Sequence, residues 1–269
     1  GVQALVRLPL VQRELDKQAG LNTAGYISGY RGSPLGGYDQ QLEKNYKLLE
    51  ENQIKFQPGV NEDLAATALW GTQQAEIRGE GKFDGIFGIW YGKGPGVDRS
   101  GDVLKHANHA GTSKFGGVLA LMGDDHTAES STLCSQSEFS MIDAMIPVLN
   151  PSGVQEIYDY GIYGWALSRY SGCWVGLKCL HDTVESTASI NVDINRLNIL
   201  LPEGFNIPED GLNIRFPDTP NAQDERMHQH KIEAVRAFSR VNKFDRTIWN
   251  GGDAKIGVVS VGKSYLDTM

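Results

Sequence analysis

From Leu21 to Leu180, short apolar runs typical of buried β-strands alternate with segments whose apolar residues have helical spacing. This alternation is typical of an α/β fold in which helices cover both faces of a parallel sheet. Crossovers between parallel strands are right-handed, so the carboxyl ends of the strands share one edge of the sheet. We therefore expect an open parallel sheet with helices on both faces and a ligand site at that shared edge.

Hydrophobic spacing gives the expected elements. Strands are expected at residues 21–28, 54–57, 85–90, 117–122, 147–150 and 174–180, and helices at 2–19, 39–52, 62–78, 102–109 and 152–169. Residues 91–99 are expected to form a glycine-rich loop. Ser152 and Gln155 are typical of a capping box for the last helix, and Gly172 would end it. The helix from residue 62 is expected to bury Leu64, Ala65, Ala68 and Leu69.

Composition divides the chain into three parts. Residues 1–189 contain the alternating pattern and are expected to form the α/β domain. Residues 190–254 are rich in Asn, Asp and Pro, and we interpret them as a connector with one helix from about 224 to 240. Residues 255–269 pattern as a buried strand, Ile256 to Val261, followed by a helix start. This indicates the beginning of a following α/β domain, so we expect the sequence to be part of a longer polypeptide.

The charge balance and the cysteine count exclude several classes of function. The 269 residues carry a formal net charge of −8, and no basic stripe could neutralise nucleic-acid phosphates. No apolar run approaches the ~20 residues of a membrane span, and no N-terminal segment reads as a secretion signal. Cys134, Cys173 and Cys179 are too few for a disulfide framework or for the four ligands of a typical iron–sulfur cluster. A reducing cytoplasm is the expected compartment.

Glu62 is the first candidate for a functional acid. It lies where the strand expected at 54–57 passes through a short loop into the next helix. A first-turn acid that complements the helix dipole, with Asn61 as N-cap, is the simpler interpretation. The functional alternative is a carboxyl group in an apolar cleft that hydrogen-bonds a heterocyclic nitrogen and shares a proton with it, with Asp63 as its solvated neighbour.

Weaker candidates lie in loops at the same expected edge. The turn Gly29–Gly37 would bring backbone close to a ligand, with Ser33 as a polar contact, although it has no complete phosphate-binding signature. Lys93 could hold an anion or simply be solvated. Gly123–His126 follows the most apolar strand, where His126 could act as an acid or base, bind a carboxylate, or belong to a capped turn.

The histidines do not predict a metal site. Asp102 and His106 are four residues apart on an expected helix, and His109 follows one turn later, but a third convincing ligand is missing. His228 and His230 fall in the connector and are expected to be exposed to solvent.

Several short motifs occur in a particular order along the chain. They are Tyr30-Arg31-Gly32-Ser33-Pro34, Val60-Asn61-Glu62, Gly123-Asp124-Asp125-His126, Ser135-Gln136-Ser137-Glu138, Asn150–Glu156 and Val258–Leu266. In order and spacing they resemble the 2-oxoacid:ferredoxin oxidoreductase family. The opening Gly1–Arg13 and the turn Gly29–Gly37 most resemble the large fused bacterial indolepyruvate ferredoxin oxidoreductases. The resemblance covers about residues 21–180 and the last dozen or so. Arg31 and Ser33 stand where the family has Pro and Thr.

This resemblance implies a thiamine diphosphate-binding domain of the pyrimidine type. Glu62 would hydrogen-bond the pyrimidine ring nitrogen and share a proton with it, and Gly32, Ser33 and Pro34 would lie at the cofactor. The implied reaction is oxidative decarboxylation of an arylpyruvate to an acyl-CoA, with electrons passing to ferredoxin.

For the substrate, the resemblance implies His126 as a second catalytic residue and contacts from Asp125, Lys93 and Arg31. The aromatic pair Trp90-Tyr91 favours a large aryl substrate. Two alternatives stay open. One is the same cofactor with pyruvate or 2-oxoglutarate, and the other is a non-catalytic α/β binding module.

The sequence lacks the motif that holds the diphosphate and Mg²⁺ in these enzymes, and it lacks the cluster cysteines. The resemblance therefore implies that Mg²⁺ and iron–sulfur clusters are bound by other parts of the enzyme. A diphosphate-binding domain would complete the cleft, and this piece would be inactive alone. Ferredoxin and coenzyme A are the implied partners, and a homodimer is the implied assembly.

Overall fold

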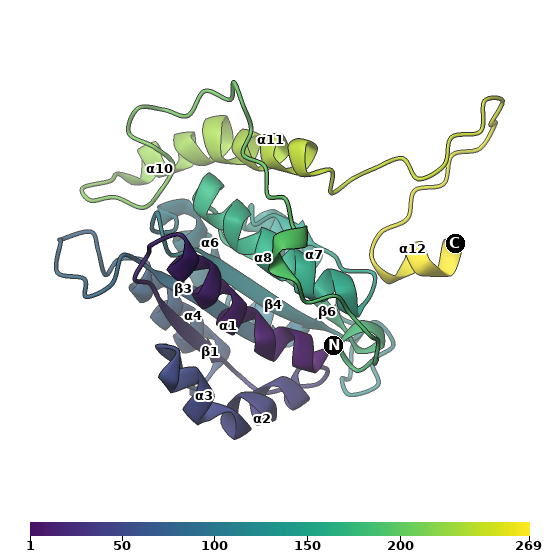
Figure 1. Cartoon of the computed structure of the whole chain (residues 1–269), viewed down its shortest axis with the longest axis horizontal. Coiled ribbons are helices and arrows are strands. Elements are labelled where there is room, and N and C mark those ends of the chain that lie inside the picture. Colours follow the sequence, from purple (N-terminus) through teal and green to yellow (C-terminus); the bar gives the residue numbers. More distant parts are fainter.

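A six-stranded parallel sheet forms the centre of the molecule (Figure 1). The structure is a computed structural model that describes residues 1–269. The strand order is β2-β1-β3-β4-β6-β5, and every neighbouring pair is parallel. The expected open parallel sheet is thus confirmed. The strands are β1 (Ala24–Gly29), β2 (Ile54–Phe56), β3 (Ile86–Lys93), β4 (Val118–Asp124), β5 (Val148–Leu149) and β6 (Val175–Leu180).

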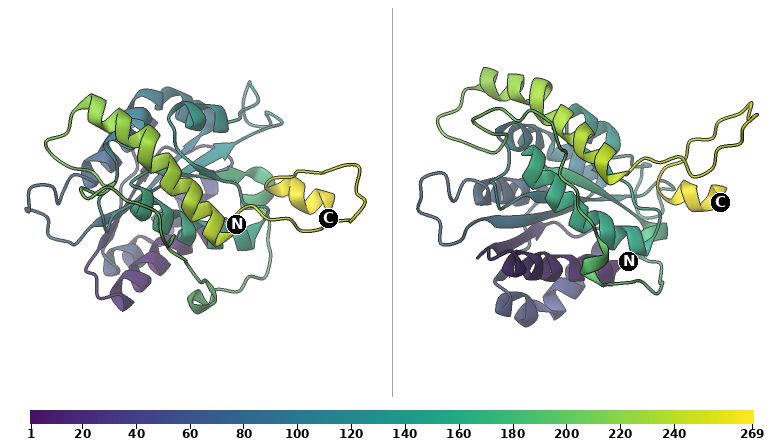
Figure 2. Two further views of the ribbon diagram at one scale, coloured as in Figure 1. Left: turned by 90° about the horizontal axis from the view of Figure 1, so that it is seen from above. Right: turned by 45° about the horizontal axis from the view of Figure 1, so that its top comes forward.

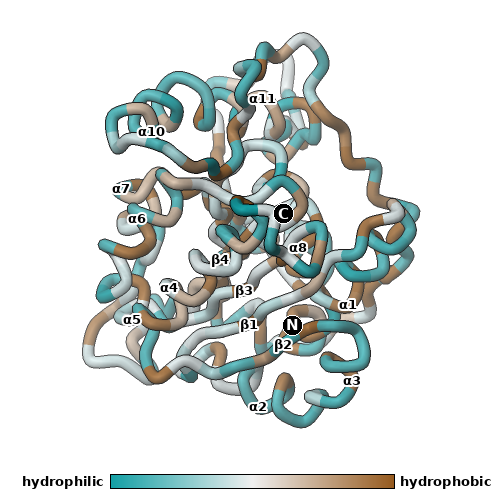
Figure 3. Tube along the Cα trace, turned by 90° about the vertical axis from the view of Figure 1, so that its left-hand side faces the viewer, coloured by the Kyte–Doolittle hydropathy of each residue, from teal (hydrophilic) through white to brown (hydrophobic).

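Helices pack on both faces of this sheet. The helices of the α/β domain are α1 (Val2–Gln18), α2 (Gly36–Lys44), α3 (Tyr46–Glu51), α4 (Glu62–Thr72), α5 (Gly94–Arg99), α6 (Gly101–Ala110), α7 (Glu138–Asp143), α8 (Val154–Ser171) and α9 (His181–Val184). In Figure 3 the sheet lies between these helices, and hydrophilic residues predominate along the outer helix α3.

Successive side chains of a strand point to opposite faces of the sheet, so the core is divided into two apolar layers. In β3, Ile89 and Tyr91 belong to the larger layer, which is packed by α1, α2 and α8. Trp90 points to the opposite layer, which is packed by α4, α5, α6 and α7. Helices on both faces explain why the strands are almost continuously apolar rather than alternating.

A buried ion pair joins α1 to α8 across the larger layer. The Arg169 guanidinium donates to both carboxylate oxygens of Asp16, at 2.6 and 2.9 Å. Asp16 also accepts hydrogen bonds from Thr23 Oγ1 at 2.6 Å and from Gln12 Nε2 at 2.9 Å. This carboxylate is therefore fully used by the fold and is not available to a ligand.

Register brings the carboxyl ends of the strands to one edge. Gly29 of β1 pairs with Tyr91 of β3, Lys93 of β3 pairs with Gly123 of β4, and Asp124 pairs with Leu180 of β6. The loops that leave these strands therefore start side by side, as the right-handed crossover rule requires.

The prediction of a glycine-rich loop at residues 91–99 is wrong. Strand β3 continues to Lys93, and α5 begins at Gly94. Tyr91 and Gly92 extend the strand because they pair with Leu121 and Met122 of β4 and lie in the core. A glycine-rich sequence here serves close packing rather than a flexible turn.

Two local details of the helices also differ from expectation. The N-cap of α8 is Gly153 without a side-chain cap, and Gln155 instead donates to Asp159, so the expected capping box is absent. Gly172 does end this helix, in the left-handed conformation. Leu64 was expected in the core but its exposed fraction is 54%, because the buried face of α4 is formed by Ala65, Ala66 and Leu69.

The connector crosses the outside of the domain and carries one continuous helix. A 3₁₀ turn (Ile194–Arg196) comes first. The continuous helix consists of α10 (Pro220–Arg226), a π-helical turn (Met227–Lys231) and α11 (Ile232–Asn242). Figure 1 shows α10 and α11 running over the ends of α6 and α8. The π turn directs Lys231 inward, where its ammonium donates to the carbonyls of Asn108, His109 and Gly172.

Beyond α11 the chain extends away from the domain (Figure 2) and ends in α12 (Lys263–Thr268). Ile256 to Val261, expected as a buried strand, is an extended segment with no strand partner. Val259 is 95% exposed. The apolar pattern alone cannot make a strand, because a strand needs a neighbour for its backbone groups.

Candidate functional site

Glu62 begins α4 at the carboxyl edge of the sheet, as the sequence indicated. Asn61 is the N-cap, and its side-chain oxygen accepts from the Leu64 backbone N–H at 2.8 Å. The Trp90 indole N–H donates to the Glu62 carbonyl at 3.0 Å. The preceding loop is tied to β1, where the Gly59 N–H donates to the Gly29 carbonyl at 2.8 Å. The start of α4 is therefore fixed to both β1 and β3.

The Glu62 carboxylate is shielded but makes no hydrogen bond within the chain. Its side chain is 12% exposed. It packs against two glycines, since a Cβ placed on Gly96 would lie 2.5 Å from Glu62 Cγ and one on Gly92 would lie 3.4 Å from it. The nearest cation is Arg99, with Nη1 at 3.7 Å from Oε2. The carboxylate thus keeps its hydrogen-bonding capacity for a ligand.

Asp63 differs from its neighbour in having partners. Its carboxylate accepts from Ser100 Oγ at 3.2 Å and lies 3.4 Å from Arg99 Nε. Its side chain is 40% exposed, so it is the more solvated of the two acids, as expected. Sequence reasoning missed Arg99 and Ser100, because nothing in the local sequence relates them to residues more than thirty positions earlier.

The turn after β1 packs onto the ends of β3 and β4. A Cβ on Gly32 would lie 3.2 Å from Lys93 Cβ, and one on Gly123 would lie 3.2 Å from Pro34 Cδ. Pro34 is buried, whereas Arg31 and Ser33 are exposed at the surface of this turn. The three loops expected at the edge therefore do meet there.

The loop after β4 is held by the polar residues that were expected to contact substrate. Asp125 accepts from the backbone N–H groups of Glu129 and Ser130, each at 3.0 Å. These hydrogen bonds, that from Ser130 first, lower the pKa of Asp125. Lys93 Nζ donates to the Ser130 carbonyl at 2.7 Å and to its hydroxyl at 2.9 Å. Both side chains therefore organise the loop.

His126 lies at the surface of the same loop. Its Nδ1 is 2.9 Å from the Ser135 carbonyl oxygen, so this nitrogen carries the proton. Ser135 in turn faces α5, because a Cβ on Gly94 would lie 2.4 Å from Ser135 Cβ. The other ring nitrogen of His126 is left for solvent or a ligand.

A buried cluster of charges lies beneath this loop and was missed from the sequence. Lys178 of β6 forms ion pairs with Asp124, at 3.6 Å, and with Glu138. Burial raises the pKa of Asp124, against hydrogen bonds from Ser137. Burial acts to raise the pKa of Glu138, but the hydrogen bond from Lys178 holds that pKa below its usual value. The signal in the sequence was a lysine within an otherwise apolar strand, which requires a buried partner.

Other parts of the molecule do not add to this edge. No group of three or more His, Cys, Asp or Glu side chains is arranged to hold a metal ion. His106 and His109 contact carbonyls within α6. His228 of the connector is exposed as expected, whereas His230 is half-buried. None of the helices has the length and apolar character that crossing a membrane requires.

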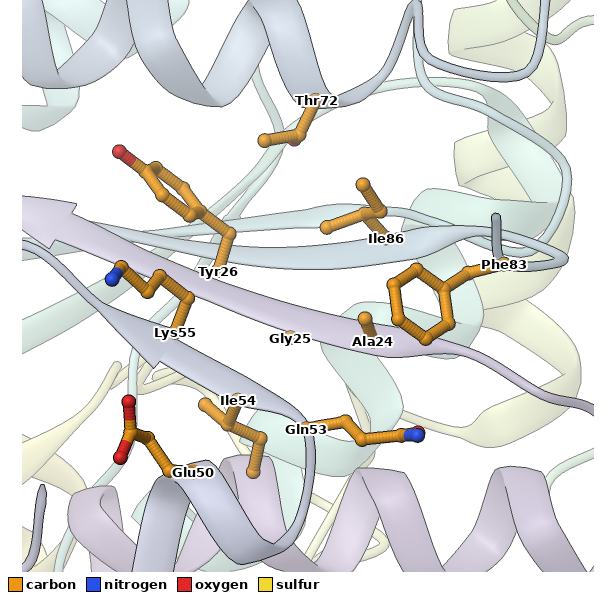
Figure 4. Close-up of a pocket in the computed structure, with 10 residues that line it drawn as sticks. All are labelled: Ala24, Gly25, Tyr26, Glu50, Gln53, Ile54, Lys55, Thr72, Phe83 and Ile86. Carbon is orange, nitrogen blue, oxygen red and sulfur yellow. The ribbon is translucent and has the colours of Figure 1, made fainter. Parts of the chain in front are cut away.

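A pocket of about 330 Å³ lies at the opposite ends of the strands (Figure 4). Tyr26 of β1, Lys55 of β2 and Ile86 of β3 line it, together with Thr72 at the end of α4. No residue singled out in the sequence lines this pocket. The candidate site at the carboxyl edge of the sheet and this cavity are therefore separate features.

The fold and the site define an open parallel α/β domain with a shielded carboxylate at a helix start on the carboxyl edge of its sheet. No protein-family model and no curated protein sequence matches the chain. A similar solved structure is 2-oxoglutarate:ferredoxin oxidoreductase from Magnetococcus marinus, which contains 2-oxoglutarate, coenzyme A and succinyl-CoA. The TM-score is 0.57 at 14% identity, over 91% of this chain and 45% of that chain.

A second similar structure is a Mycobacterium smegmatis protein assigned as a thiamin diphosphate-dependent enzyme. Its TM-score is 0.46 at 16% identity, over 70% of this chain and 35% of that chain. The first likeness establishes a shared fold. The chain spans less than half the length of the solved proteins that it resembles.

Proposed function

We propose that this chain is the pyrimidine-binding domain of a thiamine diphosphate-dependent 2-oxoacid oxidoreductase. The observation that carries the proposal is the Glu62 carboxylate, which is shielded, lacks a hydrogen-bond partner and stands at the start of α4. A carboxyl group in that state fits the ring nitrogen of an aminopyrimidine, which it would hydrogen-bond and with which it would share a proton. The fold shared with the ferredoxin oxidoreductase supports this proposal.

The residues of the edge have separable roles in this proposal. Thiamine diphosphate, when bound, supplies the nucleophilic carbon and the electron sink for decarboxylation. Glu62 would hold the proton at the ring nitrogen. Gly32, Ser33 and Pro34 would form the wall of the cofactor site toward β1.

His126 is proposed as the second catalytic group. Its free ring nitrogen is exposed at the loop after β4, where it could donate or accept a proton. Arg31, on the exposed turn after β1, is proposed as a substrate carboxylate contact. Lys93 and Asp125 would act on substrate through the loop that they hold.

The site is half of a cleft in this proposal. Val60 and Leu64 near the start of α4, and Phe139 and Ile142 on α7, expose apolar side chains on either side of α5. Apolar side chains left exposed beside a candidate site are in keeping with a surface that a partner covers. We propose that a diphosphate-binding domain covers it, in the same chain or in a homodimer, and that the domain is inactive alone.

Other parts of the enzyme would supply the remaining apparatus. Mg²⁺ and the iron–sulfur clusters are proposed to bind outside this chain, with ferredoxin as electron acceptor and coenzyme A as acyl acceptor. Ile256 to Val261 would be the first strand of a following domain. The three cysteines are unpaired, which is in keeping with the cytoplasm as the compartment.

For the substrate we propose an arylpyruvate such as indolepyruvate, on the strength of the motif resemblance. Trp90 and Tyr91 do not support this choice, because both rings are fully buried in the two core layers. Pyruvate and 2-oxoglutarate are the alternatives, and the Magnetococcus marinus structure has 2-oxoglutarate bound.

The test uses the full-length enzyme and substrate-dependent dye reduction, with arylpyruvate, pyruvate and 2-oxoglutarate in parallel. Glu62→Gln keeps the shape but cannot share the proton, so we expect a loss of roughly two or more decades in rate. Asp102→Asn, a first-turn acid on α6 with an exposed carboxylate, is the matched control and should leave the rate unchanged. Full activity of Glu62→Gln would contradict the proposal.

A further inference from the structure

One guanidinium faces two adjacent carboxylates at the start of α4. Arg99, the last residue of α5, places Nε 3.4 Å from Asp63 and Nη1 3.7 Å from Glu62. Two carboxylates in adjacent positions repel each other and compete for any proton or donor that approaches. A site that uses one of them as an acceptor therefore needs a means of occupying the other.

The hydrogen bonds show which acid is occupied. Asp63 accepts from Ser100 Oγ, which is buried, and it lies closer to the Arg99 guanidinium than Glu62 does. Glu62 has the more distant contact with Arg99 and no hydrogen bond at its carboxylate. Both partners of Asp63 come from the α5–α6 junction, so the same segment neutralises Asp63 and lies against Glu62.

We propose that Arg99 is a positioning residue that absorbs the charge of Asp63 and so leaves Glu62 as the single acceptor for the cofactor ring. This inference rests on the proposed function. It also accounts for the glycine at position 96, because α5 must approach Glu62 closely for its last residue to reach both acids. Without Arg99 two uncompensated carboxylates would face an anionic cofactor.

The test measures thiamine diphosphate binding rather than turnover. Isothermal titration calorimetry is carried out with Mg²⁺ on full-length protein stripped of cofactor. We expect Arg99→Gln to weaken binding about tenfold, because a cation is lost beside two carboxylates. Arg99→Lys keeps the charge and should recover part of the loss.

The decisive variant is the double substitution Asp63→Asn with Arg99→Gln. If Arg99 acts by neutralising Asp63, removal of the Asp63 charge restores binding to within about threefold of wild type. If Arg99 binds the cofactor directly or only supports the fold, Asp63→Asn gives no rescue. Arg236→Gln is the matched control, since Arg236 is also exposed and pairs with an acid, Glu233, but lies on α11.

The outcomes separate this inference from the function on which it rests. Weaker binding in Arg99→Gln with rescue by Asp63→Asn supports it, provided that thermal melting shows each variant to be folded. Wild-type affinity in Arg99→Gln, or loss without rescue, overturns it even where Glu62→Gln confirms the cofactor site. A wild-type protein that binds no thiamine diphosphate overturns both proposals together.

Discussion

Gly96 lies so close to Glu62 that a Cβ at position 96 would stand 2.5 Å from Glu62 Cγ and 2.6 Å from Oε1. Real side chains do not approach this closely, so Gly96→Ala must displace Glu62 or α5. We expect the variant to lose at least about tenfold in thiamine diphosphate affinity, with overpacking costing about 1–3 kcal/mol of stability. Calorimetry and urea unfolding measure the two effects.

Gly101→Ala is the control for this substitution. Gly101 begins α6, seven residues from the start of α5, and a Cβ there meets nothing within 4 Å. Its affinity should match wild type. If Gly96→Ala and Gly101→Ala behave alike, the close approach of α5 to Glu62 has no role in the site.

The Asp16–Arg169 pair predicts a large stability effect that is unrelated to the site. Arg169→Met leaves the buried Asp16 carboxylate without its cation, and we expect a loss of about 3–5 kcal/mol in the free energy of unfolding. Adding Asp16→Asn should recover part of that loss, because the unpaired charge is removed. Urea unfolding of the single and double variants measures this coupling, and additive losses would contradict it.

Lys231 predicts a pH dependence of stability at alkaline pH. Burial, followed by the charges of Arg226 and Arg215, lowers its pKa from 10.5 to about 8, although Cys173 and Asp218 act in the opposite direction. Below pH 8 the ammonium is charged in both states, so the burial penalty is present in full. Between pH 8 and 10.5 the unfolded state binds more protons, so stability rises with pH.

Comparison with Lys231→Met isolates this contribution. The free energy of unfolding of wild type relative to the variant should rise by about 3 kcal/mol in total as pH rises from 8 to 10.5. Urea unfolding at several values from pH 7 to 9.5 measures the slope. A flat difference would mean that the three carbonyl hydrogen bonds of Lys231 offset its burial.

Local patterns were sufficient for the class of fold and for the place of Glu62. Apolar runs of strand length alternating with helical spacing specify a parallel sheet, because each pattern can bury its apolar residues in only one way. Asn61 caps α4 through its own side chain, so the helix start could be located from four adjacent residues. Hydrogen bonds between residues a few positions apart can be predicted from the sequence.

Tertiary contacts decided how the charged residues and strand ends at this edge are arranged. Arg99 reaches Glu62 only because β3 and α5 fold beside α4, and Lys178 meets Asp124 only because β4 and β6 are neighbours. Pairing with β4 likewise turned an apparent loop at Tyr91 into buried strand. These contacts join residues about 30 to 55 positions apart, where no local preference operates. The sequence by itself therefore determined the sheet and its candidate acid. The tertiary structure alone decided which charged residues meet at this edge, because those residues come from segments that only packing brings together.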